Sequence, residues 1–185
     1  MLRALGASVL AVLLATPLAS AGQFGESPKD FQVAKDVAAT VNRYTQFTIF
    51  DDVNGSVKDG VVTLTGKVTM PYKRDEIAKR VAKVDGVRTV DDRIEVLPVS
   101  SFDDELRYRI ARSIYGNSSF WNYAIMPNPP IHIVVERGRV TLTGVVQSEV
   151  DRALARSLAT QFGALSVTNE LKTDAEVQAL LEKSE

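Results

Sequence analysis

The sequence has no cysteine and a single histidine, His132. Disulfide bonds, thiolate metal sites, cysteine nucleophiles and lipid anchors attached through cysteine are therefore excluded, and so is a multi-histidine metal centre. An excess of charge of one sign is also missing, because 22 Lys and Arg side chains are balanced by 23 Asp and Glu side chains. The chain thus has no overall basic field of the kind that attracts nucleic acids.

The first 21 residues have the pattern of a secretory signal peptide. Arg3 lies in a short n-region, an apolar run extends from Ala4 to Leu18, and Ala19-Ser20-Ala21 is an A-x-A cleavage site. The apolar run of about 15 residues is shorter than the roughly 18 to 20 residues that a membrane-spanning helix needs. We expect an exported protein that is cleaved after Ala21.

An internal repeat determines the predicted domain organisation. The segment Val61-Val62-Thr63-Leu64-Thr65-Gly66 recurs 78 positions later as Arg139-Val140-Thr141-Leu142-Thr143-Gly144, and a glycine turn precedes each copy. Phe31 and Phe102 each open a helical pattern upstream of these strands, and a second helical pattern follows each strand. We expect a signal peptide over 1–21, a first domain over 28–97, a linker over 98–101, a second domain over 102–174 and a short C-terminal helix or tail over 175–185.

Each copy has the element order α-β-β-α-β. In the first copy, Phe31, Val37 and Val41 lie on one side of an amphipathic helix, and Asp59-Gly60 joins two strands of alternating polarity in a hairpin. A right-handed crossover through the second helix would place the third strand parallel to the second. The predicted fold class is α+β, with two tandem α-β-β-α-β domains, each a three-stranded mixed sheet with two helices on one face.

Glycines and apolar strand residues recur in order through both copies. They are Gly60, Val62, Leu64, Gly66, Gly86, Val87, Val90, Asp91 and Ile94 in the first copy, and Gly138, Val140, Leu142, Gly144, Gly163, Leu165, Val167, Asn169 and Leu171 in the second. This double pattern resembles the BON domain family of bacterial envelope proteins. The resemblance implies a periplasmic, non-enzymatic module that associates with phospholipid membranes and supports the envelope under osmotic or other stress.

The resemblance also implies a place for lipid contact. In two-domain members that are lipoproteins, the first helix of the second BON domain is the phospholipid-contacting surface. This sequence lacks their lipobox cysteine and is more similar to the soluble, osmotically inducible BON proteins.

Candidate catalytic groups are limited to three acidic pairs, Asp51-Asp52, Asp91-Asp92 and Asp103-Asp104. Neighbours in a strand point to opposite faces, so the first two pairs should not converge on one ligand. Asp103-Asp104 lies at a predicted helix start, where acidic residues offset the helix dipole. Because nucleophile-elbow and phosphate-loop motifs are also missing, we expect no enzyme, no metal site and no cofactor.

The first helix of the second copy is the first candidate binding surface. Tyr108, Arg112 and Tyr115 are expected to lie together, opposite the apolar stripe, and Arg107 and Arg109 would add positive charge. The equivalent helix of the first copy has no outward aromatic residue. Since both copies share the requirements of the fold, this asymmetry favours a functional role.

The second candidate is an insertion of seven residues within 116–130, which contains Phe120, Trp121 and Tyr123. These side chains either cover the open sheet face or the interface between the copies, or contact a membrane or partner. The candidate lipid- or partner-binding residues are Tyr108, Arg109, Arg112, Tyr115, Phe120, Trp121 and Tyr123. We expect weak, reversible binding to phospholipid surfaces through the second domain, and the alternative is a soluble periplasmic protein-interaction adaptor with negligible lipid binding.

Overall fold

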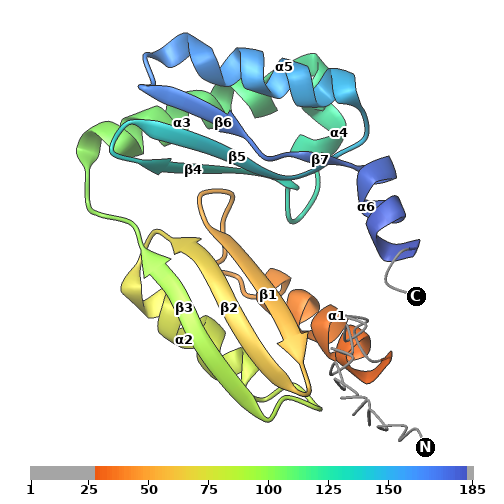
Figure 1. The fold of residues 1–185 in the computed structure, drawn as a ribbon. Coiled ribbons are helices and arrows are strands. Elements are labelled where there is room, and N and C mark those ends of the chain that lie inside the picture. Colours follow the sequence, from red (N-terminus) through yellow and green to blue (C-terminus); the bar gives the residue numbers. More distant parts are fainter. Residues whose placement is uncertain (1–27, 183–185) are drawn as a thin grey trace, which may run out of the picture.

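A computed structural model describes residues 28–182, and the predicted signal peptide lies outside this range. The two copies form two α+β domains, as predicted, and they lie one above the other in Figure 1. The first domain contains α1 (Pro28–Asn42), β1 (Asp52–Lys58), β2 (Val61–Val68), α2 (Pro71–Val81) and β3 (Thr89–Val96). The second contains α3 (Ser101–Tyr115), η1 (Ser118–Phe120), α4 (Trp121–Ala124), β4 (Ile131–Glu136), β5 (Arg139–Val146), α5 (Glu149–Ala159), η2 (Thr160–Phe162), β6 (Ser166–Asn169) and β7 (Lys172–Thr173), followed by α6 (Asp174–Glu182).

Both sheets have the predicted mixed topology. The first has the order β1-β2-β3, with β1 antiparallel and β3 parallel to β2. The second repeats this arrangement in β4-β5-β6, but its last strand is interrupted at Glu170 and Leu171 and resumes as β7, which also pairs with β5. The second sheet therefore has four strands rather than the predicted three.

The glycine turns of the two hairpins are held by buried carboxylates. Both residues of each turn have positive φ, which is the conformation of the tight turns that suit the twist of antiparallel strands. Asp30 accepts hydrogen bonds from the N–H groups of Asp59 and Gly60, and Asp103 accepts them from Arg137 and Gly138. Asp103 thus fixes a turn in addition to lying at the start of α3.

This shared contact corrects the predicted register between the repeats. If Asp30 is equivalent to Asp103, the buried residues Val33, Val37 and Val41 of α1 correspond to Leu106, Ile110 and Ile114 of α3. The prediction that Phe31 matches Phe102 is therefore wrong by two residues, and Phe102 is 58% exposed rather than part of the core. With this register the helices are 73 positions apart and the strands 78, so the second copy has an insertion of five residues rather than the predicted seven.

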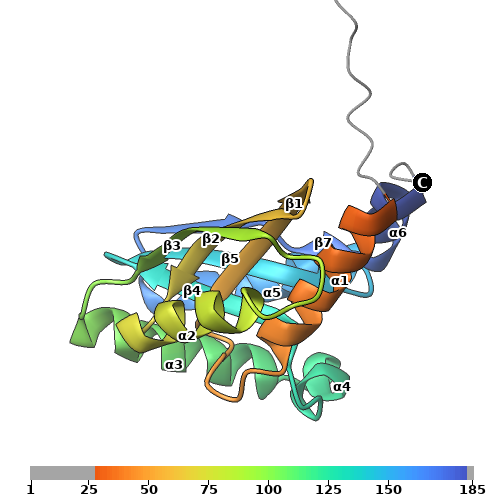
Figure 2. The same cartoon turned by 90° about the horizontal axis from the view of Figure 1, so that it is seen from below.

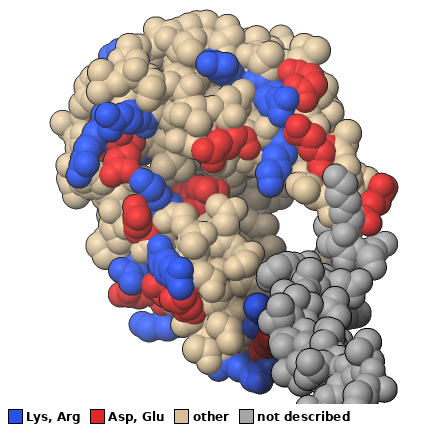
Figure 3. All heavy atoms as spheres, viewed as in Figure 1, with Lys and Arg blue, Asp and Glu red and all other residues tan. Residues whose placement is uncertain are grey.

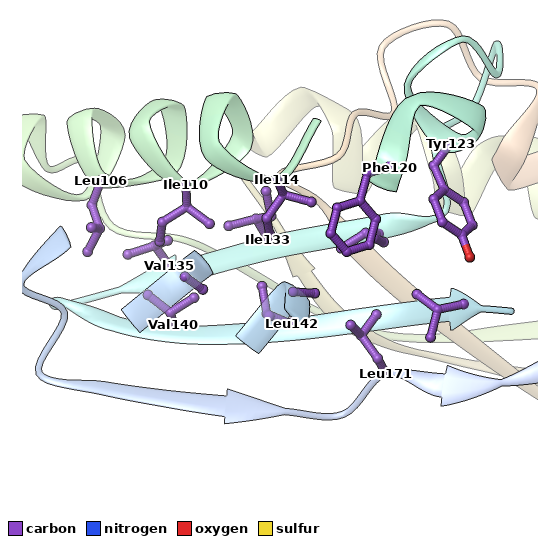
Figure 4. Close-up of a cluster of buried hydrophobic side chains, with 14 residues drawn as sticks. Leu106, Ile110, Ile114, Phe120, Tyr123, Ile133, Val135, Val140, Leu142 and Leu171 are labelled. Carbon is purple, nitrogen blue, oxygen red and sulfur yellow. The ribbon is translucent and has the colours of Figure 1, made fainter. Parts of the chain in front are cut away.

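Each domain has its core between its helices and one face of its sheet. In the second domain, Leu106, Ile110 and Ile114 project from α3 onto β4 and β5, as Figure 4 shows. Burying side chains of this size contributes roughly 1.5 to 3 kcal/mol each. The helix-free face of this sheet is turned toward the first domain (Figure 1).

The segment between α1 and β1 connects the domains. The N–H of Ile133 donates to the carbonyl of Ile49 at 2.7 Å, and Nδ1 of His132 lies 2.6 Å from the carbonyl oxygen of Asp51. A further hydrogen bond joins Thr143 to Asp52. The domains therefore share a specific interface.

Candidate functional site

Three of the predicted site residues lie exposed on α3. Tyr108 is 62% exposed, and its ring meets the ring of Phe50 from the first domain edge to face at 5.2 Å. Arg109 forms an ion pair with Glu105, one turn earlier, at 2.7 Å. Arg112 is exposed and pairs with no carboxylate within residues 28–182, so it supplies the uncompensated positive charge of this helix.

Tyr115 does not lie outward as predicted. Its hydroxyl donates to the carbonyl of Ile131 at 2.6 Å and accepts from the N–H of the same residue at 3.1 Å. Burial raises the pKa of this hydroxyl far above its ordinary value, although the hydrogen bond to Ile131 opposes the shift. Tyr115 therefore caps the edge of β4 and is not available to a ligand.

Arg107 also points inward. It is 4% exposed, donates to the carbonyl of Val135 at 2.5 Å and pairs with Asp104. The physical reason is the same as for Tyr115, because β4 is an edge strand whose outward backbone groups need partners. Arg107 therefore adds no charge to the exposed surface of α3.

Two aromatic residues of the insertion belong to the core. Phe120 is fully buried, and Tyr123 points into the same layer between helix and sheet (Figure 4). The Tyr123 hydroxyl accepts a hydrogen bond from the N–H of Gln147 at 2.7 Å and donates one to the carboxylate of Asp151 at 3.0 Å. Phe120 and Tyr123 thus extend the core on the helix side, and they cover neither the open sheet face nor the domain interface.

The equivalent place in the first domain is occupied by Asp51. Its carboxylate accepts from the N–H of Thr69 at 2.7 Å and forms a buried ion pair with Lys73 at 2.6 Å. The insertion therefore replaces a buried ion pair with a tyrosine hydroxyl at the same point of the repeat.

The other large apolar residues of the insertion are exposed. Trp121 is 66% exposed, Ile125 65% and Met126 41%. Figure 2 shows α4 beside the end of α3 on one side of the molecule. We define the α3–α4 surface by its exposed residues, which are Tyr108, Arg109, Arg112, Trp121, Ile125 and Met126. Ile125 and Met126 were not among the predicted site residues, although two large apolar residues directly before a proline-rich stretch could have drawn attention to them.

A pocket of about 790 Å³ lies between the domains. Its lining includes Asp52, Asn54, His132, Thr143 and Glu170. Within residues 28–182, no three His, Cys, Asp or Glu side chains converge as metal ligands. The pocket lining therefore mixes polar and apolar residues, and the described residues form no cluster of the kind that holds a transition metal.

Charge is mixed on the face seen in Figure 3, and no described helix fits a membrane span. On the face seen in Figure 3, Lys and Arg side chains alternate with Asp and Glu side chains. Between residues 28 and 182, every helix is too short or too polar to cross a bilayer. Any membrane contact through this part of the chain would therefore rest on a local surface.

Comparison with known proteins gives one family. The model of the BON domain matches residues 29–98 and 108–175. The potassium binding protein Kbp of Escherichia coli O6:H1 is 26% identical over 114 residues, which cover 58% of this chain and 75% of that protein.

Two solved structures of CdsD, a structural protein of the type III secretion system of Chlamydia trachomatis, also match. One, of its C-terminal domain, has a TM-score of 0.34 at 19% identity and covers 80% of this chain and 69% of its own. The other has a TM-score of 0.29 at 14% identity, with 80% and 97% covered.

Proposed function

We propose that this chain, which belongs to the BON domain family, is a non-enzymatic module that binds phospholipid membrane surfaces through the α3–α4 surface of its second domain. The observation that carries the proposal is the exposure of Trp121, Ile125 and Met126 close to the end of the helix that carries Arg112. Tryptophan and other large apolar residues favour the boundary between headgroups and acyl chains, and arginine favours anionic headgroups.

The strength of such binding follows from the few groups involved. A basic side chain near an anionic surface contributes about 1 kcal/mol, and Arg112 is the only arginine of the α3–α4 surface without an ion pair among the described residues. A single acyl chain gives only marginal membrane binding, so three apolar side chains dipping partway into the interface should give less than stable anchorage. The proposed association is therefore peripheral, reversible and sensitive to salt.

The proposed place of action is the periplasm, where the protein would help to maintain the envelope under stress. The signal peptide pattern of residues 1–21 supports export. Intact mass of the exported protein tests this, because we expect a mature chain that begins at Gly22. Retention of residues 1–21 would contradict cleavage and the proposed soluble form.

The emission of Trp121, the only tryptophan, tests lipid binding directly. Vesicles containing phosphatidylglycerol should blue-shift the emission as the exposed indole leaves water. Arg112→Glu should abolish most of the shift, because it reverses the one uncompensated charge of the surface. The melting temperature should hardly change, because Arg112 is exposed and opposite the core stripe.

The matched control is Arg156→Glu, which reverses an exposed arginine on α5 of the same domain. This variant should retain the shift. If vesicles change neither the emission nor the sedimentation of the wild-type protein, lipid binding is wrong and the protein-interaction adaptor becomes the preferred function.

A second candidate is binding of potassium, the ion in the name of the E. coli relative. The observation that favours it is that Asp52, Thr143 and Glu170, which have side-chain oxygens, are among the residues that line the interdomain pocket. Protein oxygens replace the hydration shell of potassium in its binding sites. If this is correct, the melting temperature should be higher in potassium chloride than in sodium chloride at equal concentration, and Asp52→Asn should remove the difference. Equal melting in both salts would exclude a stabilising potassium site.

A further inference from the structure

The two sheets differ in whether the outward backbone groups of their edge strands, β4 and β1, have hydrogen-bond partners. On β4, the outward N–H and C=O of Ile131 both bond to Tyr115, and the outward N–H of Ile133 bonds to Ile49. The outward C=O of Val135 bonds to Arg107. No residue of β4 is exposed. This edge is covered by side chains of α3 and by a segment of the first domain.

The equivalent edge of β1 is not covered by any group among residues 28–182 that bonds to it at Gly55. Gly55 pairs with Leu64 in the same register as Ile133 with Leu142, so its N–H and C=O also point outward. Within the described residues, no group outside the sheet bonds to the outward backbone groups of Val53, Gly55 and Val57, and three consecutive residues, Asn54, Gly55 and Ser56, are exposed.

The cause lies in three substitutions between the repeats. Where α3 places Arg107 and Tyr115 against the strand edge, α1 has Ala34 and Asn42, which are too short to cap it. Where β4 has the fully buried Ile133, β1 has Gly55. At these three positions, the first domain has a smaller residue than the second.

These substitutions leave a small groove beside the edge. It has a volume of about 110 Å³, and its lining residues are Ala34, Val37, Ala38, Val41 and Asn42 of α1 and Val53, Gly55 and Leu64 of the sheet. A cavity on the order of 150 Å³ with an apolar lining accommodates a benzene molecule. The groove beside β1, at about 110 Å³, is smaller and suits an aliphatic side chain.

The second domain shows how a segment from outside the domain can bind the corresponding strand edge. There, the carbonyl of Ile49 bonds to the edge strand, while Phe50 packs against the core of the second domain and on Tyr108. A segment from outside the domain is thus seated between the first helix and the first strand, held by one backbone hydrogen bond and one aromatic side chain.

We infer that the β1 edge of the first domain is a docking site for an extended segment of a partner protein. The segment adds as a further strand beside β1 and places one aliphatic side chain in the groove at Gly55. An unpaired strand edge with a side-chain pocket is the arrangement that β-augmentation requires. A second copy of this chain is a poorer occupant, because its own Ile49 and Phe50 are already held by its second domain.

A random-peptide display library selected on the whole chain tests this site. We expect enriched peptides with a recurrent aliphatic residue, and slowed amide exchange at Gly55 when a synthetic peptide of the selected sequence is bound. The double variant Ala34→Arg with Asn42→Tyr gives α1 the two side chains that bond to the β4 edge from α3. These side chains should occupy the β1 edge and weaken peptide binding at least tenfold.

The control Ser56→Tyr adds a tyrosine to the outer face of β1, away from the edge, and should bind peptide like the wild type. Gly55→Ile is an independent second variant that fills the groove with the residue found in β4, and it should also weaken binding. The inference is overturned if no peptide is enriched, if Gly55→Ile binds as tightly as the wild type, or if exchange at Gly55 is unaffected. Vesicle binding should be unchanged in all three variants, so this result and the lipid test are independent.

Discussion

At the scale of single residues, the pair of Asp51 and Lys73 is the most buried ion pair among the described residues. Burial by itself raises the pKa of Asp51, but hydrogen bonds from Lys73, Thr69 and Thr48 outweigh it and hold that pKa below its ordinary value. A carboxyl group with a lowered folded pKa stabilises the fold above its unfolded pKa of about 3.9, and this stabilisation is lost as pH falls through the folded pKa.

Asp51→Asn should therefore lower the free energy of unfolding at pH 7 by about 3 to 5 kcal/mol, because it leaves Lys73 buried without a counter-charge. The difference from the wild type should shrink as the pH falls below about 4. Urea unfolding at pH 7 and at low pH measures both effects. Asp91→Asn, which breaks an exposed pair with Arg93, is the control and should have little effect at either pH. An equal loss at both pH values would show that the Asp51 charge is not the cause.

At the scale of elements, the edge of β4 explains why Tyr115, which the sequence assigned to ligand binding, points inward instead. Tyr115 satisfies both outward backbone groups of Ile131, so Tyr115→Phe leaves a buried N–H and a buried C=O without their partner. The expected cost is about 1 to 3 kcal/mol of unfolding free energy, measured by urea denaturation. Vesicle binding per folded molecule should be unchanged. Reduced vesicle binding at wild-type stability would instead return Tyr115 to the lipid-binding surface.

At the scale of the whole molecule, the two domains depend on each other. Domains of about 70 residues without disulfides are marginal on their own, and Phe50 of the first domain packs on the core of the second. We expect the wild type to unfold in one calorimetric transition.

Phe50→Ala should split or broaden this transition and destabilise the protein by about 1 to 3 kcal/mol, since the side chain is partly buried. Lys67→Gln, which removes the half-buried interdomain ion pair with Glu136, is the control and should cost about 1 kcal/mol without splitting the transition. A single sharp transition retained in Phe50→Ala would show that this contact does not couple the domains.

The sequence by itself determined the features that depend on local chemistry. The repeat, the glycine hairpin turns and the order α-β-β-α-β are confirmed, because periodicity and turn residues report directly on backbone conformation. Local chemistry also fixes the start of α6, where Thr173 and Glu176 form a capping box: the N–H of Thr173 donates to the Glu176 carboxylate, and the N–H of Glu176 donates to the Thr173 hydroxyl.

Only the tertiary structure decided which side chains face a partner. Tyr115 and Arg107 occupy positions that a helical wheel cannot assign, because their direction depends on the unpaired edge of β4. Phe120 and Trp121 are neighbours of similar character, yet one is fully buried and the other mostly exposed, because only Phe120 reaches the layer between α3 and the sheet. The open edge beside Gly55 was invisible in the sequence for a related reason, since an unpaired strand edge exists only once the order of strands and the helix beside them are fixed.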